Sequence, residues 1–376
     1  MVQTNAQFPP PLPPPLPRRP MPPPLPERRY QMAFLGSTRE FFGIWFVNLM
    51  LSVLTLGIYS AWAKVRTERY FYANTRLAGT RFEYTAEPIR ILKGRLIAYV
   101  VVIALVLTSN FLPEVYFVLA FVVFLLMPMF IVLSQRFRAR YSLWRGISFR
   151  FDQPVSDAYL PFMVWKLLSG MTLGLLSPMA RMKQHEFIVE GHRYGTSRMR
   201  YHARMGDYYR QLMIAVGLGV VTLAALTTLG MLGGGLLKLL AMQGILQMQD
   251  AGIFLYGLIM VVAGFYLSLF VLMAFLQVRY TNLLWRSAAL GPHRFESTLR
   301  ARDVIWIYFG NGLAIIFSLG LAVPWAMIRL ARYRAEHWAL IAMGDLDGFV
   351  AASESEAGAA AAELLDALDT GVDFGI

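Results

Sequence analysis

Four long apolar runs constrain this chain more than any other feature of its sequence. They lie near residues 96–112, 115–134, 211–232 and 251–276. A helix needs about 20 apolar residues to cross the hydrocarbon core of a bilayer, and only the first run is marginal in length. The 376 residues are 57% hydrophobic and 15% charged, whereas soluble domains are about 25% charged. We therefore expect a polytopic membrane protein built from helices.

The charges are distributed unevenly along the chain. All 35 Lys and Arg precede residue 344 and are accompanied there by 15 of the 23 Asp and Glu, so residues 1–343 carry a formal charge of +20. Residues 344–376 contain eight acidic residues and no basic ones, which gives −8. A basic body beside lipid indicates contact with anionic headgroups. Nucleic acid is not expected as a partner, because the basic residues flank apolar spans and do not form one soluble patch.

The sequence divides into three regions. Residues 1–32 form an arm with twelve prolines between positions 9 and 26, expected to be disordered and rich in polyproline II conformation. This arm either binds a polyproline-binding protein through its two P-x-x-P-x-R patterns or is a solvated linker. Residues 33–343 form the transmembrane domain, and residues 344–376 are expected to be a disordered acidic tail. No apolar segment of the signal-peptide type precedes the first span, so insertion is expected to use the internal helices.

A motif occurs three times in the transmembrane domain, as Thr-Leu-Gly at 55–57 and 172–174 and as Ser-Leu-Gly at 318–320. We call the surrounding regions the TLG segments. The first and third also match at Asn48 and Asn311, whereas Trp165 stands at that position in the second. Matches at this many positions predict an internal repeat. The expected fold is all-α, with three TLG segments alternating with two transmembrane helical pairs.

The basic residues also predict the topology. Of the 35 Lys and Arg, 33 lie in the N-terminal region or in the stretches that flank the TLG segments, and the loops inside the helical pairs are almost bare. Lys and Arg in short loops stay cytoplasmic, so both termini are expected in the cytoplasm. Each TLG segment has basic residues on both sides, which favours a re-entrant segment that breaks at its glycine. A segment of this length is also long enough to span, so a seven-span arrangement is the alternative.

No catalytic signature is present, and neither enzymatic activity, a cofactor nor a metal site is expected. Asn48, Asn311 and Lys166 lie inside apolar segments, where polar groups either line a cavity or form hydrogen bonds between helices. Basic residues beside aromatic ones suit the headgroup zone of a membrane. The candidates for binding lipid headgroups are Lys64, Arg66, Arg69, Arg181, Lys183, Arg329 and Arg332.

Three stretches of the first TLG segment carry a resemblance to a known family. They are GIWFVN at 43–48, TLGIYSAWAKVRTERY at 55–70 and ANTRLAGTRFEY at 73–84. These stretches resemble the YjgN-like family of bacterial inner-membrane proteins, and the likeness extends over roughly residues 33–340. The resemblance implies a multi-pass protein of the bacterial inner membrane, and it implies no catalytic residues.

Two functions remain open at this point. A transporter for a small solute or lipid would use broken TLG segments and polar residues such as Asn48 and Asn311 to build a central site. A membrane scaffold would bind anionic lipid through its basic residues and recruit partners through its tails. A polar cavity between the repeats would favour the transporter, and a packed, dry core would favour the scaffold.

Overall fold

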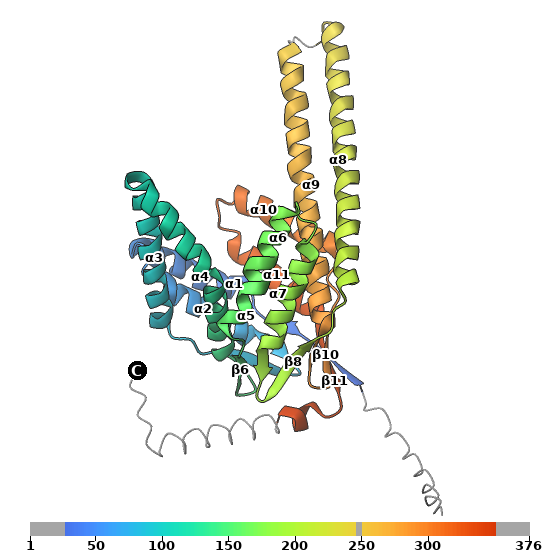
Figure 1. Ribbon diagram of the computed structural model, residues 1–376. Coiled ribbons are helices and arrows are strands. Elements are labelled where there is room, and N and C mark those ends of the chain that lie inside the picture. Colours follow the sequence, from blue (N-terminus) through green and yellow to red (C-terminus); the bar gives the residue numbers. More distant parts are fainter. Residues whose placement is uncertain (1–26, 246–249, 351–376) are drawn as a thin grey trace, which may run out of the picture.

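The computed structural model describes residues 27–245 and 250–350, and it shows helices that stand on an antiparallel sheet of eleven strands (Figure 1). The expectation of an all-α fold is therefore wrong. Most of the strands are formed by the basic and aromatic stretches between the helices. These stretches are too short and too polar to cross a membrane, and their residues alternate between the two faces of a sheet.

The sheet closes almost completely on itself. Its strand order is β1-β11-β10-β9-β8-β7-β6-β5-β4-β3-β2, so β1 and β2 are its two ends. Only Met32 separates β1 from β2 in the chain, and the Met32 N–H donates to the carbonyl of Trp338 in β11 at 3.0 Å. We call this nearly closed sheet the barrel. The strands are β1 (Glu27–Gln31), β2 (Ala33–Phe34), β3 (Thr75–Leu77), β4 (Thr80–Tyr84), β5 (Ser142–Trp144), β6 (Ile147–Phe151), β7 (His192–Tyr194), β8 (Ser197–Tyr201), β9 (Ala288–Leu290), β10 (His293–Ser297) and β11 (Trp338–Met343).

The alternation that builds the barrel is clear in β4 and β10. In β4, Arg81 is exposed and Tyr84 is buried; in β10, Arg294 is exposed, whereas His293 and Phe295 are buried. Tight turns join β3 to β4 and β5 to β6, and their central residues have positive φ, as in Ala78-Gly79 and Arg145-Gly146. Such turns match the twist of paired strands. Apolar side chains therefore line the inside of the barrel, while arginines cover its outside.

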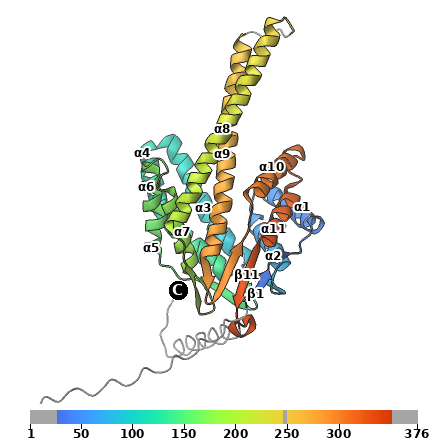
Figure 2. The same cartoon turned by 90° about the vertical axis from the view of Figure 1, so that its right-hand side faces the viewer.

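Helices leave the barrel in five groups, each inserted between two successive strands, and Figures 1 and 2 show that all rise from one side. The last helix of each group contacts the first helix of the next, and α11 contacts α1, so the groups form a ring. The helices are α1 (Thr38–Leu54), α2 (Ser60–Asn74), α3 (Pro88–Phe111), α4 (Pro113–Arg140), α5 (Val155–Tyr159), the π-helix η1 (Leu160–Val164), α6 (Trp165–Met171), α7 (Ser177–Gly191), α8 (Met205–Met242), α9 (Asp250–Ser287), α10 (Ala301–Phe317) and α11 (Val323–Glu336).

Four of the described helices are long and apolar enough to cross a membrane, namely α3, α4, α8 and α9. They contain the four apolar runs from which the transmembrane spans were predicted. The helices α8 and α9 have 38 residues each, which corresponds to about 57 Å at 1.5 Å per residue. This length exceeds the thickness of the hydrocarbon core, so their lower turns have the length to pack beside the barrel.

Each TLG segment is a helical hairpin that turns at its Leu-Gly pair. The leucine has a positive φ (49° in Leu56, 52° in Leu173, 50° in Leu319), and so has the glycine (91° in Gly57, 89° in Gly174, 93° in Gly320). The hydroxyl of the preceding Thr or Ser accepts a hydrogen bond from the N–H four residues later, as from Tyr59 to Thr55 at 2.9 Å. This bond covers an N–H at the start of the second helix.

Both ends of each TLG hairpin are held by neighbouring strands of the barrel. The pairs Phe34 with Thr75 and Phe151 with His192 join the ends of the first two hairpins, and Ser297 pairs with Trp338 at the third. The chain therefore leaves the barrel and returns to it on the same side. The leucines at the tips are 94–97% exposed. Insertion of these tips into lipid, as a re-entrant segment requires, stays a prediction.

Two segments that the sequence analysis assigned to the terminal regions belong to the folded part. Residues 27–31 of the proline-rich arm form β1, and residues 346–350 of the acidic tail form a helical turn against the barrel. The predicted disorder of the remaining arm and tail falls on residues 1–26 and 351–376, which lie outside the described residues.

Candidate functional site

A pocket of about 540 Å³ opens between the second TLG hairpin and α9, and we call it the cation pocket. Lys166 and Arg181 contribute its positive charges from α6 and α7. None of the twelve described residues that line it is acidic, whereas several carry amide, hydroxyl or imidazole groups. The lining residues are Lys166, Ser169, Ser177, Ala180, Arg181, Gln184, His185, Met273, Leu276, Gln277, Tyr280 and Thr281.

The backbone before α6 departs from regular helix geometry next to this pocket. Residues Leu160–Val164 form the π-helix η1, and Pro161 lies at its start. The side-chain amide of Gln184 donates to the Pro161 carbonyl at 3.2 Å and so ties α7 to η1. Single turns of π-helix occur frequently at functional sites because they shift the side chains that follow. The first turn of α6, which follows η1 directly, includes Lys166.

A hydrogen-bonded chain of three side chains lies beneath the cation pocket. The Nδ1 atom of His185 lies 2.5 Å from the hydroxyl of Tyr208, which also bonds to the hydroxyl of Tyr201. The ring of Tyr280 stacks on Tyr208 with centroids 5.1 Å apart. This chain connects the pocket to the interior of the barrel, because Tyr201 is the last residue of β8.

Burial changes the proton affinity of this chain. It lowers the pKa of His185 to about 3, and the positive charge of Arg181 acts in the same direction. Burial also raises the pKa of Tyr201 to about 12. Both groups are therefore uncharged near neutral pH, and the charge of the pocket comes from Lys166 and Arg181.

Asn48 and Asn311, which were expected either to line a cavity or to form hydrogen bonds between helices, each bond within their own hairpin. Asn311 is 7% exposed; its Nδ2 donates to the Ala326 carbonyl at 3.2 Å, and its Oδ1 accepts from Nη1 of Arg329 at 3.2 Å. Asn48 is 4% exposed and donates to the Ala63 carbonyl at 3.4 Å. The third candidate, Lys166, lines the cation pocket.

The predicted headgroup residues are distributed over three places. Arg181 lies in the cation pocket, and Arg329 and Arg332 line a second pocket of about 460 Å³ that Trp306 and Trp325 also line. The guanidinium of Arg329 lies 5.2 Å from the ring centroid of Trp325. The remaining candidates lie on α2 and α7: Lys64 and Lys183 form ion pairs with Glu68 and Glu186, Arg69 donates to the Ala86 carbonyl, and Arg66 is exposed.

Sequence reasoning missed the barrel and the residues inside it. The signal that could have found them is the alternation of apolar and polar residues in TRFEY (80–84), ISFRF (147–151), SRMRY (197–201) and HRFES (293–297). A glycine precedes each of these stretches by one or two positions, which is typical of a β-hairpin. Among residues 27–245 and 250–350, no group of three or more His, Asp or Glu is placed to hold a metal ion.

Comparison with known proteins gives one family and several relatives. The family described as "Bacterial protein of unknown function (DUF898)" matches residues 29–367. "Inner membrane protein YjgN" of Salmonella typhimurium (strain LT2) is 24% identical over 363 residues, covering 85% of this chain and 89% of that protein. "Inner membrane protein YjgN" of Escherichia coli (strain K12) is 42% identical over 55 residues, which are 15% of this chain and 14% of that protein. No solved structure has significant similarity to this chain.

Proposed function

Because this chain belongs to the family of bacterial proteins of unknown function designated DUF898, and similar chains are inner membrane proteins, we propose that it is a multi-pass inner-membrane protein that transports an anionic, lipid-like molecule. The four long apolar helices support the membrane assignment. We propose that the helical ring is the route of transport and that the protein has no catalytic role. We propose further that its TLG hairpins are copies of one ancestral unit.

The cation pocket is the observation that carries this proposal. Lys166 and Arg181 face a space in which no acidic residue compensates them. A charged group beside lipid is costly unless a partner of opposite charge accompanies it. An anionic headgroup supplies that partner, and hydrogen bonds to a charged group are stronger than neutral ones. The exposed Met273 lines the pocket, and the exposed Leu167 and Leu168 follow Lys166 in α6, so the chains of a lipid have an apolar surface to contact.

The orientation is part of the proposal. We propose that the barrel and both termini face the cytoplasm and that the helical groups enter the membrane from that side. Arginines on the outside of the barrel support this orientation, because basic residues remain on the cytoplasmic side of the inner membrane. Eight strand arginines are exposed, namely Arg28, Arg29, Arg76, Arg81, Arg150, Arg198, Arg200 and Arg294.

A proteoliposome assay tests the transport function. Fluorescent phosphatidylglycerol placed in one leaflet should cross to the other faster with the protein than in protein-free vesicles. The double change Lys166→Gln and Arg181→Gln should slow the crossing at least about tenfold, because each removes a charge-assisted hydrogen bond. Arg302→Gln changes an exposed cation outside the pocket and should have no effect. Absence of any crossing by the wild-type protein would refute transport.

A scaffold is the second candidate, and the exposed arginines of the barrel favour it. Neutralising Arg198, Arg200 and Arg294 should then abolish adhesion of the protein to a second, anionic vesicle, because such binding is electrostatic and salt-dependent. The change would leave the cation pocket intact. Loss of adhesion without any lipid crossing in the first assay would favour the scaffold, with its tails as the recruiting segments and the proline-rich arm as a site for a polyproline-binding protein.

A further inference from the structure

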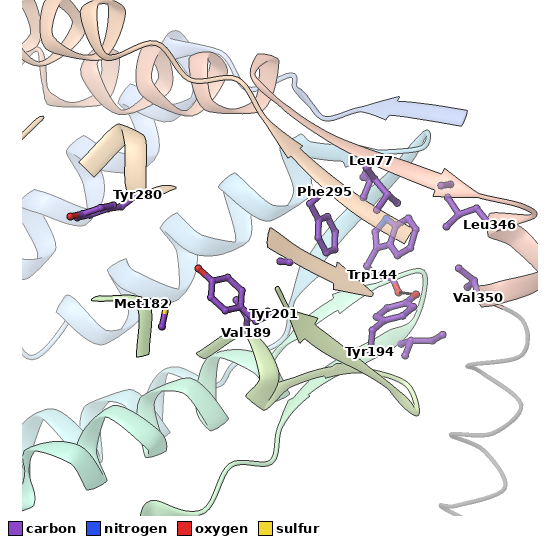
Figure 3. Packing of buried hydrophobic residues seen from close by; sticks show 14 of the residues in the cluster. Leu77, Trp144, Met182, Val189, Tyr194, Tyr201, Tyr280, Phe295, Leu346 and Val350 are labelled. Atoms are coloured by element: carbon purple, nitrogen blue, oxygen red, sulfur yellow. Dashed lines mark hydrogen bonds between the residues drawn. The ribbon is translucent and has the colours of Figure 1, made fainter. Parts of the chain in front are cut away.

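The barrel contains a cavity of its own, with a volume of about 390 Å³, which is distinct from the cation pocket and from the pocket lined by Arg329 and Arg332. This volume lies within the range of about 300–1,000 Å³ typical of small-molecule sites. Side chains from strands between β3 and β11 form most of its wall, together with residues of α7 and α9. Figure 3 shows Leu77, Trp144, Tyr194 and Phe295 gathered in this region. None of its nineteen lining residues is Lys, Arg, Asp or Glu. We call it the barrel cavity.

The helical turn at 346–350 covers one end of the barrel cavity. Leu346 and Phe349 line the cavity, and the ring centroids of Phe349 and His293 lie 4.5 Å apart. An ion pair between Arg145 and Asp347 links this turn to the turn between β5 and β6. The cover therefore depends on a few contacts at the end of the described chain, whereas the wall is formed by strands of the sheet and by residues of α7 and α9.

Three buried nitrogen atoms in the wall have no hydrogen-bond partner. They are Nε1 of Trp144, Nε1 of Trp338 and Nε2 of His293. The Nδ1 atom of His293 accepts from the N–H of Met343 at 3.2 Å, so Nε2 carries the hydrogen of the neutral ring. Trp144 and His293 are 5% and 1% exposed. Buried donors without a partner cost free energy, and each requires an explanation.

We propose that the barrel cavity binds one uncharged, largely apolar molecule whose carbonyl groups accept hydrogen bonds from Trp144, Trp338 and His293. The donors lie in β5, β10 and β11, and β5 lies across the barrel from β11. A ligand with more than one hydrogen-bond acceptor is therefore needed to bind donors from both sides of the barrel. A carboxylate fits less well, because no cation lines the cavity to compensate its charge. This site is separate from the cation pocket and does not depend on the transport function.

Three probes of equal chain length separate the contributions to binding. Delipidated full-length protein in detergent is incubated with methyl palmitate, palmitate or hexadecane, and native mass spectrometry measures the fraction carrying one molecule. Methyl palmitate should bind most tightly, because it combines an apolar chain with an uncharged carbonyl. The double change Trp144→Phe and Trp338→Phe should weaken its binding about tenfold and leave hexadecane unchanged.

Two further variants control for folding and for non-specific binding. Met199→Trp adds volume to the cavity wall and should reduce binding of all three probes. Trp45→Phe makes the same chemical change as the test variants at a position outside the cavity, in the cluster of α1 and α11, and should bind like the wild type. Equal occupancy of the wild type and Met199→Trp would overturn the site. Equal binding of methyl palmitate and hexadecane would overturn the role of the donors.

Discussion

Asn48 and Asn311 show what a single position reveals in the sequence and what it conceals. Their equivalence was visible because they stand at the same distance before their TLG motifs. The structure adds that each donates to a carbonyl fifteen residues later, in the second helix of its own hairpin. Which carbonyl an asparagine side chain reaches depends on how the two helices of the hairpin face each other. The sequence around one asparagine does not give this geometry. Hydrogen bonding between helices and lining of a cavity were therefore both possible roles for the two asparagines.

The two asparagines should differ in their contribution to stability. Asn311→Leu removes the partner of both the Ala326 carbonyl and the Arg329 guanidinium, so the free energy of unfolding should fall by about 2 kcal/mol. Asn48→Leu removes one long bond and an oxygen that has no partner, so its loss should stay below about 1 kcal/mol. Denaturant unfolding in one detergent measures both. Equal losses would contradict the assignment of the Arg329 bond.

His185 should make stability depend on pH. Burial and Arg181 lower its pKa to about 3, whereas an unfolded histidine has a pKa of about 6.5. Between these values the unfolded chain binds a proton that the folded chain does not, so stability falls as pH decreases from about 6.5. Between pH 7 and pH 5 the wild type should lose on the order of 2 kcal/mol more than His185→Gln. Thermal unfolding across this pH range tests the difference, and the exposed His202→Gln should behave like the wild type.

At the scale of elements, the sequence predicts helices better than strands for a physical reason. A run of about 20 apolar residues suits a membrane-spanning helix, and the four apolar runs do lie in helices, namely α3, α4, α8 and α9. The strands have two to six residues, and a stretch this short acquires a fixed structure only from its neighbours. The alternation of apolar and polar residues in TRFEY and SRMRY was visible. Helices separate successive β-hairpins in the chain, however, so the sequence does not indicate which hairpins pair with each other.

The turns of the TLG hairpins should tolerate only glycine at one position. Gly57 has a φ of +91°, and a Cβ atom added there meets nothing within 4 Å. Gly57→Ala should therefore destabilise by about 1–2 kcal/mol through backbone strain alone. Gly43 lies inside α1 in equally open space, so Gly43→Ala should stabilise by up to about 1 kcal/mol. A lower melting temperature for Gly57→Ala and a higher one for Gly43→Ala would establish that the positive φ of Gly57 is the cause. A lower melting temperature for both variants would refute it.

The whole molecule explains why the basic residues are arranged as they are. The barrel collects the ends of all five helical groups, and some of the arginines that flank the TLG segments, such as Arg81, Arg198 and Arg294, lie in its strands. The order of charges along the chain predicts that the basic stretches flanking the TLG segments share one side of the membrane, and the union of their strands in one sheet is compatible with that prediction. The charges could not predict the barrel, because β1 and β11 pair across more than 300 residues, as in Arg28 with Ala342.

Topology provides the most direct test at this scale. The chain has no native cysteine, so single cysteines at Arg81, Arg198 and Arg294 report on β4, β8 and β10 without background. Because these strands belong to one sheet, all three positions must lie on the same side of the membrane. We expect all three to resist an impermeant maleimide in intact cells and to react after the membrane is permeabilised. A cysteine at Glu114, at the far end of the pair α3 and α4, should react in intact cells. Labelling of Arg81→Cys from outside, with Arg198→Cys protected, would require a single crossing by a TLG segment and would contradict the hairpin.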